Sequence, residues 1–392
     1  MLPAQTKSEF NVEIIRVDRI ERHPNADRLG IVKANGVPVV VNLADVQIGD
    51  LMLYVPIDAL VPLSDPAFAF LAKGSKPNAT HARIRAIRLR GVYSEGLLVP
   101  IPTGVAATEP VVLNAAATEL IGISKYLPPA DRKELLGGPP RTRERSRLEA
   151  QADRIMPVYG VDSGRRHPDA IAPGTPVVLT EKIHGCNARY VFTEGKLWVG
   201  SHKTLRGVTR HVLVENINRA WLRLRRALGF PKRTDLFEAH GDVWWKVAEQ
   251  YNLKERLQHP WAKGLVFYGE IYGNGLQKRG GVSFDYDTRF VNYGFRVFDI
   301  YDPKTKTFLS YNKMRGLCVG LELGTAPLIY VGDFEPLFTE SLTRGKTALG
   351  NGHIREGVVV RTDVDTADPN RRVLKFVSED YKLLGAEDDK DE

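Results

Sequence analysis

A short charged segment between two strand-like runs is the feature that most constrains this chain. Residues 176–180 and 188–192 are rich in β-branched and aromatic residues, a composition that favours strands. The heptapeptide between them, residues 181–187, is Glu-Lys-Ile-His-Gly-Cys-Asn. A lysine close to a glycine, with an imidazole and an amide nearby, suits a site that receives a phosphate group. The alternative is a surface turn whose lysine is merely solvated.

The segments that follow this lysine carry polar residues in strand-like surroundings. Residues 267–273 form an apolar run that ends in a carboxylate and a glycine, and residues 296–300 carry an aromatic side chain. Residues 355–361 and 373–377 are two further apolar runs with lone charges. Short strands with one or two polar residues each are therefore expected to follow the lysine one after another.

In this order and spacing, the motifs resemble those of the covalent nucleotidyltransferases, which include the ATP-dependent ligases and the mRNA capping enzymes. Histidine at position 184, where other members have aspartate, is similar to the RNA ligase branch. The resemblance extends from about Met156 to about Gly385. It implies an α+β fold in which a mixed α/β nucleotidyltransferase domain, the adenylation domain of ligases, is built on antiparallel sheets.

The first hundred residues predict a separate β-rich domain. Strand-length segments at 10–17, 30–34, 37–42 and 51–55 are separated by Asn, Gly, Pro and Asp turns, a spacing that indicates a small barrel. Residues 20–29, with Gly49 and Asp50 further on, resemble the OB-fold tRNA-binding modules of some synthetases. An N-terminal OB-fold β-barrel ahead of the catalytic domain resembles the Deinococcus-type RNA ligases.

These patterns divide the chain into four parts. We predict an OB-fold nucleic-acid-binding domain over 1–127, a linker over 128–155, a nucleotidyltransferase domain over 156–385 and an acidic tail over 386–392. A helix is expected within 105–127 with Gly122 as its stop, and another over 212–228. The linker is rich in Pro, Gly and mixed charges, so it is expected to be a solvated segment.

Composition narrows the class of protein. With 392 residues, 43% hydrophobic and 26% charged, the chain is expected to be soluble, globular and cytoplasmic. Its two cysteines form no disulfide framework, and it has no apolar run of about 18 residues, which argues against export and membrane insertion. A net charge of +8 and a pI near 9.3 favour a polyanionic partner.

Four arginines in the first domain are candidates for that contact. Arg83, Arg85, Arg88 and Arg90 lie in a strand-like run whose parity changes at residues 86–87, as a bulge would produce. We expect these arginines to bind nucleic acid. The alternative is a solvated edge strand, which basic residues also protect from aggregation.

The resemblance implies a nucleophilic role for Lys182. An ordinary lysine has a pKa of about 10.4, so only about one in a thousand is the free amine at neutral pH. A bound divalent metal and Lys375 would favour that amine, which then forms a phosphoramidate with AMP. The resemblance also assigns Glu270 to the ribose hydroxyls and Glu356 to a divalent cation, Mg or Mn. The alternative for both is an ordinary edge-strand glutamate.

The remaining candidates surround this chemistry. Phe298 would stack on the purine, unless it is a plain core phenylalanine. Asn187 is expected to hold the water shell of the metal, and the other candidates for contacts near the nucleotide and its phosphates are Glu181, His184, Lys203 and Arg361. The sequence departs from the family at Cys186, where threonine is usual, and at Val377, where several relatives have a second lysine. Arg371 or Arg372 could replace that lysine.

The resemblance therefore predicts an ATP-dependent RNA ligase that joins 3′-hydroxyl and 5′-phosphate ends through a lysyl-AMP intermediate, with ATP as substrate and Mg or Mn as cofactor. The expected partner is a nicked RNA or RNA/DNA duplex with RNA on the 3′-hydroxyl side. The template strand, the preferred metal and any protein partner stay open. The alternatives are a capping guanylyltransferase, a DNA ligase, or a non-catalytic protein that binds RNA.

Overall fold

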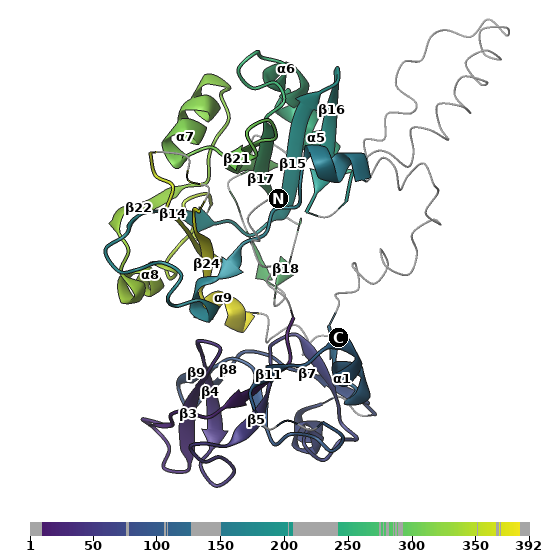
Figure 1. Ribbon diagram of the computed structural model, residues 1–392, viewed down its shortest axis with the longest axis vertical. Coiled ribbons are helices and arrows are strands. Elements are labelled where there is room, and N and C mark those ends of the chain that lie inside the picture. Colours follow the sequence, from purple (N-terminus) through teal and green to yellow (C-terminus); the bar gives the residue numbers. More distant parts are fainter. Residues whose placement is uncertain are drawn as a thin grey trace, which may run out of the picture.

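The computed structural model describes residues 10–384 apart from 76–77, 106, 108, 127–149, 203, 207–241, 274–275, 277, 280–281, 285, 287, 289–292, 351, 366–367 and 369. This part of the chain forms two lobes (Figure 1). We call residues 10–126 the N-lobe and residues 150–384 the C-lobe. Strands dominate both lobes, and short helices cover the C-lobe sheets, which confirms the predicted α+β class.

The N-lobe is built almost wholly from short strands, and each predicted strand is present. Its sheets have the orders β10-β5-β1-β11, β12-β6-β7 and β2-β3-β4, with a β8-β9 hairpin. The elements are β1 (Glu13–Arg16), β2 (Glu21–Arg22), β3 (Leu29–Ala34), β4 (Val37–Asn42), β5 (Leu51–Val55), β6 (Ala59–Pro62), η1 (Ala69–Gly74), β7 (His81–Arg83), β8 (Ile87–Leu89), β9 (Val92–Ser94), β10 (Leu97–Val99), β11 (Val111–Val112), α1 (Ala115–Leu120) and β12 (Ser124–Lys125).

Strand β5 lies at the centre of the N-lobe because both of its faces are buried. Leu53 and Val55 belong to one hydrophobic cluster, whereas Met52 and Tyr54 belong to another. Successive side chains of a strand point to opposite faces, so the largely apolar sequence of this strand predicts burial on both sides. The two clusters together form the interior of the small barrel.

Two predictions for residues 105–155 need correction. The expected helix is shorter, because residues 111–112 pair with β1 as strand β11 and only Ala115–Leu120 is helical. Gly122 follows it with a φ of +66°, which suits the predicted stop. Residues 150–155, expected in the linker, are helical, and Ala152 packs in a C-lobe cluster. Residues 128–149 of the predicted linker lie outside the described residues.

The C-lobe contains two five-stranded sheets. Sheet I has the order β13-β24-β23-β14-β22 and sheet II the order β16-β15-β17-β20-β21; within them, only β13 and β24 pair in parallel. The elements are β13 (Asp162–Ser163), η2 (Gly164–Arg166), β14 (Pro176–Lys182), β15 (Cys186–Thr193), β16 (Lys196–Ser201), α5 (Val243–Gln250), α6 (Leu253–Leu257), β17 (Val266–Tyr272), β18 (Lys278–Arg279), β19 (Val282–Ser283), β20 (Gly294–Asp302), β21 (Thr307–Phe308), α7 (Tyr311–Gly320), β22 (Leu328–Asp333), α8 (Pro336–Leu342), β23 (Gly357–Arg361), β24 (Val373–Val377) and α9 (Glu379–Leu384).

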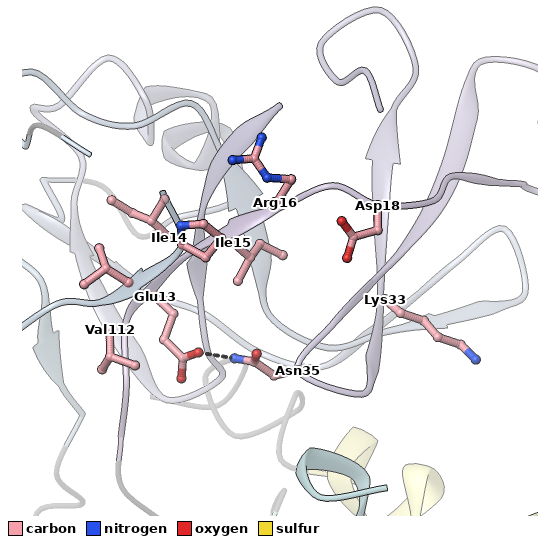
Figure 2. A pocket seen from close by; sticks show the side chains of 10 residues that line it. Glu13, Ile14, Ile15, Arg16, Asp18, Lys33, Asn35 and Val112 are labelled. Atoms are coloured by element: carbon pink, nitrogen blue, oxygen red, sulfur yellow. Dashed lines mark hydrogen bonds between the residues drawn. The ribbon is translucent and has the colours of Figure 1, made fainter. Parts of the chain in front are cut away.

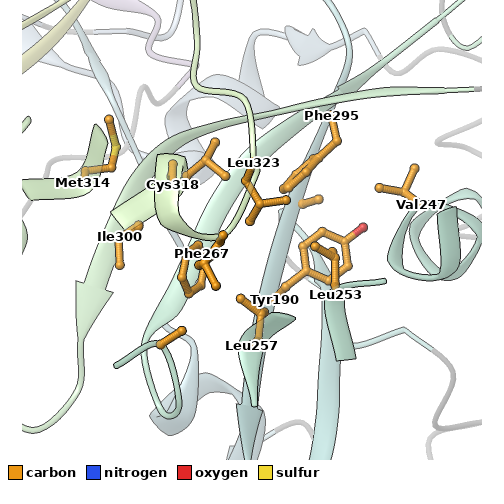
Figure 3. Packing of buried hydrophobic residues seen from close by; sticks show 14 of the residues in the cluster. Tyr190, Val247, Leu253, Leu257, Phe267, Phe295, Ile300, Met314, Cys318 and Leu323 are labelled. Carbon is orange, nitrogen blue, oxygen red and sulfur yellow. The ribbon is translucent and has the colours of Figure 1, made fainter. Parts of the chain in front are cut away.

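The largest core of the C-lobe covers one face of sheet II. Figure 3 shows Phe267 and Phe295 of the sheet close to Leu323, with Cys318 of α7 and Leu253 of α6 around them. These side chains are almost completely buried, and burying one apolar side chain of this size contributes about 1.5–3 kcal/mol. The helices therefore fix sheet II from one side and leave its opposite face for other contacts.

The predicted heptapeptide connects the two sheets. Strand β14 of sheet I ends at Lys182, and β15 of sheet II begins at Cys186. Only residues 183–185 lie between them, so Lys182 is at the junction of the two sheets. Within the described ranges, no helix is long and apolar enough to cross a membrane.

Candidate functional site

Gly185 allows the two sheets to approach each other at the junction. A Cβ atom at this position would lie 2.2 Å from the carbonyl oxygen of Ile271 in β17, so any other side chain would push the strands apart. Gly357 plays the same part beside β24, because a Cβ there would lie 2.1 Å from the carbonyl oxygen of Phe376. Because neither glycine has a side chain, the strands beside them approach closely and the charged residues on those strands can lie near one another.

Four charged side chains from neighbouring strands face this junction, and we call them the Lys182 cluster. Lys182 Nζ lies 2.6 Å from Glu356 Oε1, just before β23. Lys375 lies on β24, which pairs with β23, and Glu270 lies on β17, where it opposes Asn187. The cluster thus combines two ammonium and two carboxyl groups from both sheets.

Burial and mutual charge shift the protonation of this cluster. Burial lowers the pKa of Lys375 to about 8, and the nearby positive charge of Lys182 acts in the same direction. Burial raises the pKa of Glu270 to about 8; Lys182 opposes this shift and Glu356 adds to it. Shifts of this size on several neighbouring groups are common at functional sites.

The oxygen atoms of the Lys182 cluster and Asn187 can bind a cation only together with further ligands. Among the residues that the structure describes, no group of three or more His, Cys, Asp or Glu is arranged to hold a metal ion. Glu356 and Asn187 offer oxygen atoms, and Asn187 Oδ1 is buried without a hydrogen-bond partner in the described part of the chain. A buried acceptor of this kind requires a donor such as water. A hard cation here would take its remaining oxygens from water and phosphate.

His184 is enclosed by aromatic residues. Its ring centroid lies 4.1 Å from that of Phe284, and its backbone N–H donates to the Tyr286 hydroxyl at 3.0 Å. The Tyr381 hydroxyl lies 2.5 Å from its Nδ1 atom. The sequence analysis identified none of these three aromatic residues, because Tyr381 is 197 positions away from His184 and no motif spacing connects them.

Glu181 and Phe298 make contacts with the protein itself. The Glu181 carboxylate accepts hydrogen bonds from the Thr347 hydroxyl and from the Ala348 N–H at 2.8 Å, so it holds that loop. Phe298 is half-buried, and its ring centroid lies 5.2 Å from that of Tyr159. The part of the Phe298 ring that stays exposed is compatible with stacking.

Arg361 is the predicted site residue that the structure places elsewhere. Its guanidinium donates two hydrogen bonds of 2.7 Å to Asp363, and Arg371 donates to Asp299 at 2.6 Å and to Asp363 at 3.0 Å. We call Asp299, Arg361, Asp363 and Arg371 the Asp299 cluster; their side chains are at most 4% exposed. In this structure both guanidinium groups contact carboxylates in the core, so a contact of Arg361 with the phosphates and a replacement of the lysine at 377 by Arg371 or Arg372 stay predictions.

The arginine run of the N-lobe is split between two sheets. Residues 81–83 form β7 and residues 87–89 form β8, so the expected bulge is a break between strands. Arg83 binds Asp58 at 2.8 Å and lies over the Tyr126 ring, while Arg88 binds Asp380 of the C-lobe at 2.9 Å. Arg85 is half-buried and Arg90 is exposed.

Three predicted features cannot be placed. Lys203 and the predicted helix over 212–228 lie outside the described residues, as does the acidic tail over 386–392.

A separate open cavity of about 550 Å³ lies on the N-lobe, lined by Glu13, Arg16, Lys33 and Asn35 among others (Figure 2). Its mixed charges favour no ligand class, and no residue of the Lys182 cluster lines it.

Comparisons with known proteins agree with this geometry. The RNA ligase family model matches residues 175–377, just over half of the 392 residues, and an OB-fold domain model matches residues 11–101. A search of curated proteins gave no match.

Solved structures with the same fold include three of Naegleria gruberi RNA ligase, each 18% identical to this chain. A lysine-to-alanine mutant with ATP and Mn has a TM-score of 0.66 and covers 96% of this chain and 98% of that chain. A glutamate-to-alanine mutant with AMP and Mn has a TM-score of 0.66 with coverages of 95% and 97%. The structure with PPi has a TM-score of 0.67 with coverages of 97% and 98%. These findings confirm the predicted arrangement of an N-terminal OB domain and a ligase domain.

Proposed function

The chain belongs to the RNA ligase family, and we propose that it joins RNA ends with ATP through an AMP adduct on Lys182. The observation that carries this proposal is the Lys182 cluster, in which the lysine of the matched region lies 2.6 Å from Glu356 and faces Lys375 and Glu270. The Naegleria gruberi structures with ATP and Mn or AMP and Mn support ATP as the substrate and a divalent metal as the cofactor.

The proposed reaction has three transfers. The neutral amine of Lys182 attacks the α-phosphorus of ATP, forming an N–P bond as the bond to pyrophosphate breaks and the amine loses a proton. A 5′-phosphate oxygen then attacks the same phosphorus, and the N–P bond breaks. Finally, the 3′-hydroxyl attacks the adenylylated 5′-phosphate, which releases AMP and seals the strand.

The residues around Lys182 support each transfer. Lys375, as a cation beside the nucleophile, stabilises the negative charge on the phosphates and on the leaving pyrophosphate. A divalent cation held by Glu356, with Asn187 in its water shell, would neutralise the triphosphate. Glu270, whose pKa of about 8 keeps it protonated at neutral pH, can both donate to and accept from the ribose hydroxyls. Phe298 would stack on the purine.

We assign His184 to the second transfer. It lies two residues from the nucleophile at the turn between the two sheets, and its imidazole can hydrogen-bond a phosphate as donor or cation. The expected substrate is a nick with RNA on the 3′-hydroxyl side, held in part by the N-lobe. Neither Cys186 nor Cys318 forms a disulfide, which supports a reducing compartment such as the cytoplasm.

The direct test is transfer of label from α-labelled ATP to the protein in the presence of Mg or Mn, followed by peptide mapping. We expect the label on the peptide that contains Lys182, and we expect no label from α-labelled GTP. Label from GTP alone would favour a capping enzyme. The complete absence of label would favour the alternative of a non-catalytic protein that binds RNA.

A further inference from the structure

Helix α9 is the element through which the N-lobe reaches the Lys182 cluster. It follows β24, the strand of Lys375, after a single residue, Ser378. The Ser378 N–H donates to the carbonyl oxygen of Glu356 at 2.8 Å, so the start of α9 is fixed to the cluster. Figure 1 shows α9 between the two lobes, on the side of the C-lobe that faces β8 and β9.

The middle of α9 contacts the lysine motif. Tyr381 is only 4% exposed, and its hydroxyl lies 2.5 Å from His184 Nδ1. Its ring centroid also lies 5.5 Å from that of His184 and 5.8 Å from that of Phe284. A hydrogen bond at one ring nitrogen fixes both the orientation of an imidazole and the proton position of the ring. Tyr381 is thus placed to hold the His184 ring in one orientation.

The neighbours of Tyr381 on both sides contact the N-lobe. Lys382 Nζ lies 2.5 Å from Glu95 Oε2, and their side chains are 12% and 9% exposed. Glu95 also accepts a hydrogen bond of 2.7 Å from the Tyr93 hydroxyl. Asp380 binds Arg88 at 2.9 Å, but these side chains are almost half exposed. An exposed pair contributes little, whereas breaking a buried pair is costly, so Glu95–Lys382 is the stronger connection.

A second contact joins the two lobes. Gly36, at the β3–β4 turn, has a φ of +75°, and a Cβ atom there would lie 1.6 Å from the carbonyl oxygen of Arg165. Arg165 in turn donates two hydrogen bonds to Glu340, of 2.5 and 2.6 Å. Arg165 lies close enough to Glu95 and Lys382 for their charges to interact, so this contact and the Glu95–Lys382 pair together connect the N-lobe to α9.

We propose that Tyr381 is a positioning residue for His184, and that the N-lobe holds it in place through the buried Glu95–Lys382 pair. The inference rests on the proposed function, in which His184 acts when AMP moves to the 5′-phosphate. The N-lobe then contributes to the second transfer through α9, in addition to any contact that it makes with nucleic acid. The first transfer needs neither Tyr381 nor the N-lobe contact.

Two conservative variants and one matched control test this inference. Tyr381→Phe removes only the hydroxyl, and Lys382→Met removes the charge but keeps an apolar stem. The control, Arg344→Ala, breaks a third ion pair of α9, Arg344–Glu379 at 3.0 Å, which joins two residues of the C-lobe. All three are made in the full-length chain.

The assay separates the two transfers. Self-adenylylation is measured with labelled ATP, and AMP transfer is measured in a single turnover from pre-adenylylated protein to a saturating nicked duplex. We expect all three variants to adenylylate within about twofold of wild type, and Tyr381→Phe and Lys382→Met to transfer AMP about tenfold more slowly or worse. Arg344→Ala should match wild type. The double variant should be no slower than the slower single one, because both act through the same contact.

A measurement without ligase activity distinguishes this inference from the proposed function. NMR of the imidazole nitrogens in histidine-labelled protein should show the His184 signals shifted in Tyr381→Phe and unchanged in Arg344→Ala. Unshifted signals together with wild-type AMP transfer would overturn the inference and leave the proposed function standing. A wild-type protein that never accepts label would overturn the proposed function, while the NMR result still decides the contact. If Lys382→Met does not fold, Glu95→Gln tests the same pair.

Discussion

The Lys182 cluster and the Asp299 cluster are alike in composition but opposite in what surrounds their charges. Each combines two acidic and two basic side chains from strands of the C-lobe and the loops beside them. In the Asp299 cluster, each guanidinium donates at least two hydrogen bonds to carboxylates. In the Lys182 cluster, one ion pair is found, Lys182–Glu356. The side chains of Glu270 and Lys375 have no hydrogen bond or ion pair among the described residues.

The pKa values follow the same division. Burial works to raise the pKa of Asp299, but Arg371 and Arg361 outweigh it and hold that pKa below its ordinary value. At Glu270 the opposing charge of Lys182 does not outweigh burial, so the pKa rises to about 8. Charges that the fold already satisfies stabilise structure, whereas charges left unsatisfied are available for a ligand. The comparison therefore favours the Lys182 cluster over the Asp299 cluster as the reactive site that we propose.

The sharpest way to break this comparison is to remove the nucleophile. Lys182→Ala should lower self-adenylylation by about a thousandfold or more, because a covalent intermediate cannot form without the amine. Lys182→Arg should fail equally, since a guanidinium stays protonated. Both variants should keep the wild-type melting temperature within a few degrees. Label on either variant, quantified from gels after incubation with labelled ATP, would show that another residue is the nucleophile.

The Asp299 cluster should respond in the opposite way. Asp299→Asn removes one of the two carboxylates that Arg361 and Arg371 share and leaves Asp363 as their remaining charged partner in the cluster. Breaking a buried pair on one side costs about 3–5 kcal/mol. We expect the free energy of unfolding, measured in urea, to fall by that amount while the folded protein still accepts label from ATP. If the variant is as stable as wild type but accepts no label from ATP, the Asp299 cluster would act in the reaction. Arg361 would then be a phosphate-binding residue, and the contrast between the two clusters would be wrong.

The two clusters also show what could be predicted from the sequence. The α+β fold and the grouping of Lys182, Glu356 and Lys375 are expected only from the resemblance to the nucleotidyltransferases. The strands follow from local patterns, because each lies in a short apolar run bounded by turn residues. Arg361 could not be placed in this way. Its partner Asp363 is two residues away, but Asp299 is 62 residues away, and strand alternation does not reveal which of two buried polar neighbours a guanidinium contacts.

The same limit applies between the lobes. The Asp380–Arg88 and Lys382–Glu95 pairs join residues that are 292 and 287 positions apart, and a short charged helix at the end of a domain is normally solvated. Only the three-dimensional arrangement shows that one side of α9 touches the N-lobe and that Tyr381 touches His184.

The distinction between satisfied and available charge extends to the surface of the N-lobe. Arg83 is bound by Asp58 and covered by Tyr126, whereas Arg90 is exposed, and its side chain has no ion pair among the described residues. Arg90→Ala should weaken binding of a nicked duplex about equally for different sequences and reduce the slope of log K against log salt by about 1. Arg83→Ala should lower the melting temperature and leave that slope unchanged. Fluorescence anisotropy at several salt concentrations measures both, and identical slopes for the two variants would remove the distinction.

The smallest expected effect concerns the pH dependence of stability without ligands. Between the ordinary glutamate pKa of about 4.3 and the folded value of about 8, the folded protein holds a proton on Glu270 that the unfolded chain does not. The free energy of unfolding of wild type should therefore decrease relative to Glu270→Gln as pH rises from 5 to 8, and level off above 8. The slope cannot exceed about 1.4 kcal/mol per pH unit, which is the value for a difference of one full proton between the folded and unfolded states.

Asp299 provides the contrast within the same titration. Its folded pKa lies below its ordinary value, so its contribution to stability is present above that ordinary value and is lost only as pH falls through the folded pKa. Lys375, with a pKa near 8, is protonated in both states below that pH and adds no slope there. Urea unfolding of wild type and Glu270→Gln in chelator at pH 5, 6, 7 and 8 thus isolates one group. Parallel curves across this range would mean that Glu270 is ionised in the folded protein and that its charge already has a partner, as the charges of the Asp299 cluster do.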